Sequence, residues 1–356
     1  MLNWISSLRN INYDKYKDIL EYTPKDNSKI KYSYYNENKV LKCFIDFVKR
    51  EEKNKYIVSL SGGVDSMVVA SILCYLKCNV VGCHINYNNR EETKDEQKFL
   101  EEWCYNNNIK LYVKDINDMK RGEVKRSNYE CYTRNIRFNF YKEILTKEEG
   151  DCILLGHHKD DIVENIVANV CRGRNLLDLA VIKEENVVNG VMMCRPMIGF
   201  YKSDVYEFAD ENNVPYFKDT TPDWSVRGKY RNKLHPELEN TFGENVRSNL
   251  LGLSRQSSEW NDLIMKEMIE PFLDGVIYDE NSVSFNVDKY VNYPLCFWNI
   301  IFAKLFYRYG KNCPSRKGIT TFMNNLGGIN KASLSDSCVC NIKDKKVIIK
   351  FNYSNI

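Results

Sequence analysis

Residues 59 to 66 read Ser-Leu-Ser-Gly-Gly-Val-Asp-Ser, and this stretch decides the expected fold. A short strand-like run, 55–60, precedes it, and a helix-like run, 66–76, follows it. Adjacent glycines let a backbone adopt unusual dihedrals and approach a ligand closely. Free N–H groups and the helix dipole favour an anion at such a turn. We therefore expect a phosphate-binding loop rather than an ordinary glycine turn, although the sequence lacks the GxxxxGK[ST] pattern of a Walker loop.

The chain after this loop alternates strand-like and helix-like runs. The expected strands are 80–85, 110–114 and 152–155, and the expected helices are 93–106, 129–145, 160–171 and 202–212. Such alternation indicates a parallel sheet with helices on both faces. Ligands of these sheets bind at the carboxyl ends of the strands, so the turns after residues 60, 85 and 155 should share one edge.

A second polar motif, Gly-His-His-Lys-Asp-Asp-Ile-Val-Glu-Asn, occupies residues 156–165 at the start of an expected helix. Asp161 and Glu164 are three residues apart and share one helical face, with His157 just before them. Two carboxylates and an imidazole beside a phosphate loop can hold Mg²⁺, position an amine or move protons. The alternative is a capped helix with a solvated acidic first turn.

Composition indicates a globular protein that acts in a reducing compartment. Of the 356 residues, 43% are hydrophobic and 28% charged, and no apolar run is long enough to span a membrane. The 13 cysteines are scattered and form no CxxC pair, which favours free thiols in the cytoplasm over a zinc or iron–sulfur site. Because the net charge is only +3, any surface that binds nucleic acid must be local.

The chain divides into four expected parts. Residues 1–50 form an N-terminal extension with short helices at 15–21 and 39–49. Residues 51–240 form the catalytic domain and end in a polar loop, 218–236. Residues 241–275 form a helical connector around a long helix, 245–268. Residues 276–356 form a small C-terminal domain with helices at 295–309 and 315–325 and a hairpin at 337–351.

In this order, the motifs resemble the tRNA(Ile)-lysidine synthetase family, which belongs to the PP-loop ATP-pyrophosphatase superfamily. The resemblance covers about 300 residues in the short form of the family, and it rests on these segments: Ser61–Ser66, His84–Arg90, Glu130–Phe138, His157–Glu164, Arg195–Ile198 with Lys202–Val205, and Asp219–Pro236. The chain departs from the usual family pattern at Tyr87, Asn165 and Lys233 and in its N-terminal extension.

The resemblance implies an α/β fold: a parallel-sheet, adenine nucleotide alpha-hydrolase-like PP-loop ATPase domain with a smaller, mostly helical C-terminal domain. It implies a ligase that uses ATP and Mg²⁺. The C2 oxygen of the wobble cytidine in tRNA(Ile) with a CAU anticodon would attack the α-phosphate of ATP and release pyrophosphate. The ε-amine of L-lysine would then displace AMP and form lysidine.

The expected site residues follow from the matched motifs. The nucleotide-binding set is Ser61, Gly62, Gly63, Val64, Asp65, Ser66, His84, Asn86 and Arg90. The catalytic set is Asp65, Arg134, His157, Asp161 and Glu164, and the expected Mg²⁺ ligands are Asp65 and Asp161. We expect Arg134 to face the nucleotide, with the alternative that it lies along the surface of its own helix.

Three basic clusters favour an RNA partner: Lys120, Arg121, Lys125 and Arg126; Arg172 and Arg174; and Arg227, Lys229, Arg231 and Lys233. The C-terminal domain, with Lys311, Arg316, Lys317 and Lys331, is expected to select the tRNA. A tRNA thiolase on the same fold is the second hypothesis, but Cys83 and Cys152 lie in apolar strands, where thiols are usually inert. The third is a non-catalytic RNA-binding relic. The oligomeric state, including a homodimer, is left open.

Overall fold

The computed structural model describes residues 11–24, 38–51, 55–117, 124–221, 223–326, 330–336 and 338–352. These residues form two compact units: the first runs to residue 168 and includes 181–252, and the second consists of 169–180 and the chain from 253 onward. The four-part division expected from the sequence is finer and stays a prediction. Lys120 and Arg121, from one basic cluster, lie outside the described residues. In the described part of the chain, every helix is too short or too polar to cross a membrane.

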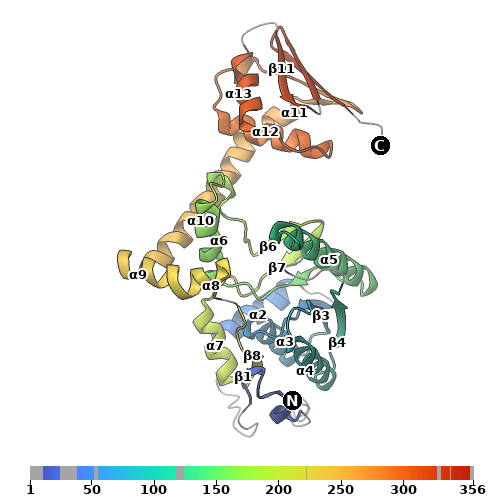
Figure 1. Cartoon of the computed structure of the whole chain (residues 1–356), viewed down its shortest axis with the longest axis vertical. Coiled ribbons are helices and arrows are strands. Elements are labelled where there is room, and N and C mark those ends of the chain that lie inside the picture. Colours follow the sequence, from blue (N-terminus) through green and yellow to red (C-terminus); the bar gives the residue numbers. More distant parts are fainter. Residues whose placement is uncertain are drawn as a thin grey trace. The chain divides into compact units, whose positions relative to one another are not determined.

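A six-stranded sheet forms the centre of the first unit (Figure 1). In spatial order its strands are β4 (Lys110–Asp115), β3 (Val80–Asn86), β2 (Tyr56–Ser59), β5 (Ile153–Leu154), β7 (Val191–Cys194) and β6 (Glu185–Val188). All neighbours pair in parallel except β6, which is antiparallel to β7 at the edge. The predicted parallel sheet is therefore confirmed, with one antiparallel strand added.

Helices cover both faces of this sheet because its strands are apolar on both sides. One face packs against α2 (Lys39–Glu51), α3 (Val64–Tyr75), α4 (Thr93–Asn106) and α7 (Lys202–Glu211), and the other against α5 (Arg126–Lys147). Side chains along β2 alternate between the two faces of the sheet: Val58 belongs to the core on the first face and Ile57 to the core on the other. Both side chains are almost fully buried.

The strand order reverses beside β2. From there the chain proceeds to β3 and β4 on one side, and to β5 and β7 on the other. Ligands of open α/β sheets bind at such a switch point. The loop after β2 is Leu60–Gly63, and the loop after β5 is Leu155–His158, which leads into α6 (Lys159–Cys171). An added Cβ at Gly156 would lie 2.7 Å from Cβ of Asp65, so these two loops touch.

The second unit combines helices with a five-stranded antiparallel sheet. Its strands, in spatial order, are β11 (Asn330–Ser335), β12 (Cys338–Lys343), β13 (Lys346–Phe351), β10 (Ser282–Asn286) and β9 (Ile277–Tyr278). The helices are α11 (Glu270–Asp274), α12 (Leu295–Arg308) and α13 (Arg316–Asn324), and α10 (Val246–Ile264) leads into the unit from the first. The predicted hairpin is confirmed by β12 and β13, whereas β9, β10 and β11 were not predicted.

Two predicted segments are wrong. Residues 15–21 do not form a helix: a 3₁₀ turn (Tyr13–Tyr16) is followed by β1 (Leu20–Tyr22), which pairs with β8 (Tyr216–Phe217). Residues 218–236 are not a loop throughout: α8 (Val226–Lys229) and a π-helical turn (Tyr230–Leu234) lead into α9 (His235–Phe242). Ser225 starts this helical run, since its hydroxyl accepts a hydrogen bond from the Gly228 amide.

Candidate active site

The Ser61–Ser66 loop has a shape that only glycine permits at position 62. Gly62 has a φ of +84°, and an added Cβ would lie 1.9 Å from Cε2 of Phe217. The carbonyl of Gly62 also accepts a hydrogen bond of 2.9 Å from the Phe217 amide. The loop therefore rests directly on β8.

Ser66 shapes the loop from inside. Its buried hydroxyl accepts hydrogen bonds from the amides of Ser61 (3.1 Å) and Gly62 (3.2 Å) and donates one to the Gly63 carbonyl (3.0 Å). Gly63 precedes α3 and makes no side-chain cap hydrogen bond, so the positive dipole end of that helix remains available to a ligand. This arrangement suits an anion.

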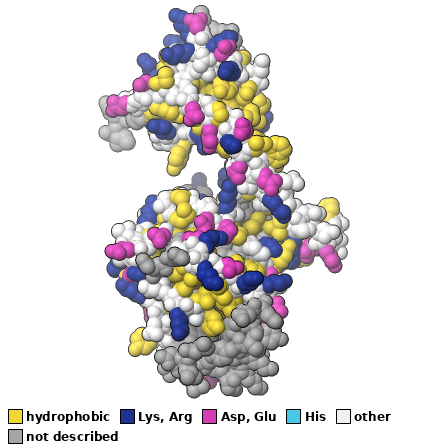
Figure 2. All heavy atoms as spheres, turned by 180° about the vertical axis from the view of Figure 1, so that it is seen from behind, with side chains coloured by type: hydrophobic (Ala, Val, Ile, Leu, Met, Phe, Trp, Pro, Cys, Tyr) yellow, Lys and Arg dark blue, Asp and Glu magenta, His cyan; other side chains and the backbone are white. Residues whose placement is uncertain are grey.

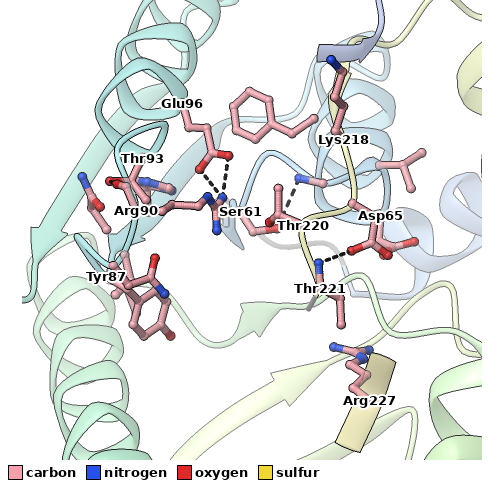
Figure 3. A pocket seen from close by; sticks show the side chains of 18 of the residues that line it. Ser61, Asp65, Tyr87, Arg90, Thr93, Glu96, Lys218, Thr220, Thr221 and Arg227 are labelled. Atoms are coloured by element: carbon pink, nitrogen blue, oxygen red, sulfur yellow. Dashed lines mark hydrogen bonds and ion pairs between the residues drawn. The ribbon is translucent and has the colours of Figure 1, made fainter. Parts of the chain in front are cut away.

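A cavity of about 300 Å³ adjoins this helix start (Figure 3). Its charged lining residues are Arg90, Lys202, Lys218, Arg227 and Arg231 on the basic side, and Asp65, Glu96 and Asp219 on the acidic side. Five cations and three carboxylates line the cavity, and Asp161 and Glu164 behind this lining pair with Arg227 and Arg231. The helix dipole, together with lysine and arginine side chains that can turn toward a ligand, favours a polyanion such as a triphosphate.

The end of β3 forms another wall of this cavity, as predicted from the His84–Arg90 motif. His84 is buried, and its Nδ1–H donates to the Leu60 carbonyl at 2.9 Å, which leaves Nε2 as an acceptor. Burial lowers the pKa of His84, so the ring is neutral at pH 7. The Arg90 guanidinium binds both oxygens of Glu96, at 2.5 and 2.7 Å, and Figure 3 shows this pair beside Tyr87.

Asp65 is held at the bottom of the site by a cation from α7. Its Oδ2 accepts a hydrogen bond from Lys202 Nζ at 2.6 Å. Its Oδ1 is buried and has no hydrogen-bond partner among the described residues, and His158 Nε2 lies 3.7 Å away. An orphaned carboxylate oxygen at the mouth of a phosphate loop is an available ligand for a cation.

Asp161 and Glu164 lie on one face of α6, as predicted, and two arginines neutralise them. Arg227 and Arg231 each bridge both acids; both contacts to Glu164 Oε2 are 3.2 Å, and Arg231 reaches Asp161 Oδ1 at 3.4 Å. Burial raises the pKa of Asp161, but the nearby His158 and Arg227 outweigh it and the net pKa is lowered. Asp161 is thus ionised at pH 7 and already holds cationic side chains.

His157 is buried and neutral, and Arg195 orients its ring. The Nε–H of Arg195 donates to His157 Nδ1 at 3.0 Å, so the proton of a neutral ring resides on Nε2. Burial is the main cause that lowers the His157 pKa to about 4. His157 can therefore donate a hydrogen bond from Nε2 at pH 7 but carries no charge there.

Not every predicted residue lines the cavity. Ser61, Gly63, Val64, Asp65, His84, Asn86 and Arg90 do, whereas Gly62 and Ser66 support the loop from behind. Asp161 and Glu164 reach the cavity through Arg227 and Arg231, which line it.

Arg134 lies elsewhere. It is exposed on α5, with its guanidinium 5.9 Å from the Phe138 ring centre, and it does not line the cavity. The preceding residue Thr133 is buried, whereas Arg134 and Asn135 are both exposed, so Arg134 lies toward the outer side of α5. The predicted orientation toward the cavity is therefore not seen, whereas a catalytic role for Arg134 stays a prediction.

The cysteines give no support to a thiol mechanism. All 13 lie in the described part of the chain as free thiols, and none is among the described residues that line the cavity. Cys83 and Cys152 are buried, and burial raises the pKa of Cys83 to about 12. Such thiols are protonated and weakly reactive at pH 7.

Several residues that build the site were not predicted from the sequence. His158 is fully buried among Asp65, Asp160 and Asp161, with its ring nitrogens 3.3 to 3.7 Å from their oxygens. Arg227 and Arg231 were assigned to RNA contact rather than to Asp161 and Glu164. Lys202 and Arg195 stood in motifs of the resemblance without an assigned role. Phe217 gave no signal, because its contact with Gly62 joins positions far apart in the sequence.

A comparison with protein families matches residues 36–238 to the PP-loop domain. The chain belongs to the PP-loop domain family. The matched range contains both loops of the switch point and every residue that lines the cavity.

Relatives of the PP-loop chain support the resemblance found in its motifs. A tRNA(Ile)-lysidine synthase of Chlamydia felis is 26% identical over 85% of this chain and 93% of that protein. One of Mycoplasmopsis pulmonis is 34% identical over 50% of this chain and 61% of that protein. Among solved structures, the U34-tRNA thiolase NcsA from Methanococcus maripaludis aligns with a TM-score of 0.46 at 19% identity, covering 61% of this chain and 80% of that one, which is too distant to bear on the reaction. The resemblance to the lysidine synthetase family is confirmed.

Proposed function

We propose that this PP-loop protein is a tRNA(Ile)-lysidine synthetase. It uses ATP to adenylate the C2 oxygen of the wobble cytidine, with release of pyrophosphate, and then joins L-lysine through its ε-amine, with release of AMP. One observation carries this proposal: a loop suited to phosphate and a pair of carboxylates that already hold cations meet at the same switch point. Adenylation needs the first, and capture of a lysine ammonium group needs the second.

ATP is proposed to bind with its phosphates at the start of α3. The uncapped helix end attracts the triphosphate, and lysine and arginine side chains that line the cavity can bind its oxygens. His84, Asn86 and Arg90 would bind the remainder of the nucleotide, because they form the wall at the end of β3. Lys202 would exchange its contact with Asp65 for one with a phosphate.

Asp65 is the proposed protein ligand for Mg²⁺. In the described part of the chain its buried Oδ1 has no hydrogen-bond partner, and Mg²⁺ commonly binds one or two carboxylates together with water and substrate phosphates. Asp161 fits less well, because one of its oxygens accepts from the His158 amide and the other from arginines. When bound, Mg²⁺ would neutralise charge on the phosphates.

The amine step is assigned to Asp161 and Glu164. A lysine ammonium group has an ordinary pKa of about 10.4 and must lose a proton before it attacks. In this structure the two acids bind guanidinium groups of Arg227 and Arg231, so their oxygens suit a cationic donor. We propose that the arginines turn toward the phosphates when ATP binds, so that the acids can bind the lysine amine and accept its proton. Neutral His157 would donate from Nε2 to an acceptor on the base or nucleotide.

The second unit is proposed to contact the tRNA away from the anticodon. Figure 2 shows Lys and Arg side chains spread over its visible face among uncharged and acidic ones. A groove of about 830 Å³ within this unit presents Lys304 and Arg316 beside Asn261 and Asn299. Cations and amides of this kind position a phosphate backbone rather than read bases.

In the decisive experiment, a tRNA pool is incubated with the protein, ATP, Mg²⁺ and isotope-labelled lysine. The nucleosides of the tRNA are then identified by mass spectrometry. We expect a lysine-labelled cytidine derivative, and its absence would reject the proposal. ATP–pyrophosphate exchange with tRNA but without lysine measures adenylation alone.

Two variants then separate the steps. In Asp161→Asn and Glu164→Gln, lysine incorporation should fall by about 10² to 10⁴-fold, the range typical of general acid–base groups. Exchange should survive better than incorporation in Glu164→Gln. Glu143→Gln, at an exposed position of α5 that does not line the cavity, is the control. Wild-type incorporation in both variants would refute the assignment of these acids.

A further inference from the structure

Residues 11–24 pack tightly on the first unit, although they lie outside the 36–238 range of the family domain. Ile11, Tyr16, Ile19 and Leu20 are all buried in its core. The ring of Tyr16 contacts that of Phe99 edge to face, with centres 5.1 Å apart. This segment is therefore part of the folded unit.

Its main partner is β8, a strand of only two residues. Leu20 pairs with Phe217 and Tyr22 with Tyr216 in an antiparallel ladder, and the Lys218 amide donates to the Ile19 carbonyl at 2.9 Å. In the described part of the chain, β1 is the only strand that pairs with β8. A two-stranded pair gains little stability by itself, so β8 depends on this segment and on its packing.

The other side of β8 supports the phosphate loop. Phe217 donates its amide to the Gly62 carbonyl, and its ring fills the space where a side chain at Gly62 would lie. The residues that follow β8, from Lys218 to Thr221, line the cavity. Displacement of β8 would therefore disturb both the loop and one wall of the cavity.

A second connection runs through α7. The Tyr22 hydroxyl donates to the Asp210 carbonyl at 3.1 Å and lies 3.0 Å from Asn213 Oδ1, at the end of α7. Its ring stacks on Tyr216 with an interplanar angle of 8°. The same helix begins with Lys202, which binds Asp65 in the site.

We propose that residues 19–22, which pair with β8 and tie it to α7, act as a brace, through β8 and Phe217, that holds the Ser61–Ser66 loop in its nucleotide-binding shape. The brace positions the loop and does not itself contact substrate. Its effect on ATP binding rests on the proposed function above, whereas its effect on the loop of the free protein does not.

Three single variants of the full chain test the brace. Leu20→Ala removes buried packing at the β1–β8 pair, and Tyr22→Phe removes only the hydroxyl that ties β1 to α7. Tyr16→Phe is the matched control: it loses a bond to Glu102 on α4 but keeps the ring that packs on Phe99. The readouts are deuterium uptake of a peptide spanning the loop, the Kd for ATP, and the thermal midpoint of unfolding.

In Leu20→Ala we expect the rate of deuterium uptake in the loop to rise about tenfold. The Kd for ATP should also rise about tenfold, which corresponds to about 1.4 kcal/mol of binding free energy. Tyr22→Phe should change both in the same direction by about threefold, while its thermal midpoint stays close to that of Tyr16→Phe. Tyr16→Phe should leave loop uptake and Kd unchanged. Because Leu20→Ala could unfold the unit, Tyr22→Phe keeps the test decisive.

The brace is refuted if Tyr22→Phe and folded Leu20→Ala match the wild type in loop uptake. It is also refuted if Tyr16→Phe raises loop uptake as much as they do, since the effect would then be general destabilisation. Failure of the wild-type protein to bind ATP would refute the proposed function instead, and loop uptake would still judge the brace.

Discussion

The two units bury different kinds of side chain. In the first unit the buried acidic, basic and imidazole residues are His84, Glu96, Glu148, His158, Asp161 and Arg195. In the described part of the second unit the buried polar residues are only Asn169, Ser254 and Ser257, and the core combines aliphatic side chains with many aromatic ones. Burial of charge costs free energy unless each group is paired.

The position of the buried charges shows why the first unit tolerates that cost. His84, His158, Asp161 and Arg195 all lie at the carboxyl edge of the sheet, within the candidate site or one hydrogen bond from it. Glu148 is different, because it lies at the opposite edge, where Lys55 and Lys110 lead into β2 and β4. Buried charge thus lies in the candidate site at one edge of the sheet and in a cluster of ion pairs at the other.

The largest expected effect breaks the first unit at its loop. Gly62→Ala combines a left-handed φ with a Cβ that would overlap the Phe217 ring. The free energy of unfolding should fall by about 2–5 kcal/mol, and pyrophosphate exchange should be lost even where the protein folds. Chemical denaturation and exchange assays measure the two effects.

Gly63→Ala is the matched control for this variant. Its Cβ would meet only Ser61 Oγ, at 3.6 Å, and the φ of Gly63 is −68°. Gly63→Ala should lower the free energy of unfolding by under about 1 kcal/mol. Equal losses of unfolding free energy in the two variants would contradict the proposed loop geometry.

The second prediction tests whether the aromatic core of the second unit serves stability alone. Trp298 is fully buried and contacts Phe272, Phe297 and Phe322 edge to face. Trp298→Ala should cost about 3–5 kcal/mol of stability, while ATP binding by the first unit persists. Trp260→Ala, at an exposed site of the same unit, should cost under about 0.5 kcal/mol. Loss of ATP binding in a folded Trp298→Ala protein would show that the core of the second unit does more than stabilise that unit, contrary to this prediction.

The third prediction concerns Glu148 and pH. Hydrogen bonds from Lys110, Lys55 and Tyr112 lower its pKa from 4.5 to about 2. A carboxylate with a depressed pKa stabilises the fold above its unfolded pKa, and this contribution is lost as pH falls toward 2. Glu148→Gln should therefore lower the free energy of unfolding at pH 7 by about 1–2 kcal/mol, a figure already reduced for solvent screening of exposed Lys110. The variant should also lose less of its free energy of unfolding than the wild type between pH 5 and pH 2. Denaturation curves of Glu148→Gln and exposed Glu143→Gln, run across this range, would contradict it if they coincide.

Sequence predicted the elements whose signals are local. The strands and helices from 55 to 171 follow from apolar periodicity, and the Ser61–Ser66 loop follows from its two glycines. Predicted α4, at 93–106, has the observed bounds. The confirmed PP-loop family follows from local motifs, four of which each lie within ten residues.

The missed features depend on contacts between distant segments. Strand β8 has two residues, too few for any period, and exists because Leu20 pairs with it from nearly 200 residues away. The 218–236 segment looked like a loop because it is polar, yet its arginines find acids on α6 and Ser225 caps its helix. Propensity gives way to tertiary partners in both cases.

The smallest expected effect decides whether the candidate site extends onto α5. Arg134 and Arg137 both lie beside the Phe138 ring, with guanidinium carbons 5.9 and 5.7 Å from its centre. An exposed arginine in such a contact contributes under about 1 kcal/mol. Arg134→Ala should therefore lower the free energy of unfolding by less than about 1 kcal/mol and change the rate of adenylation by less than about threefold. Arg137→Ala is the matched control, because it shares the ring but was not predicted to act in catalysis. If Arg134→Ala instead lowered lysine incorporation by tenfold or more while Arg137→Ala did not, α5 would have to supply a cation to the substrate-bound site, and the predicted catalytic role of Arg134 would stand despite its exposure in the free protein.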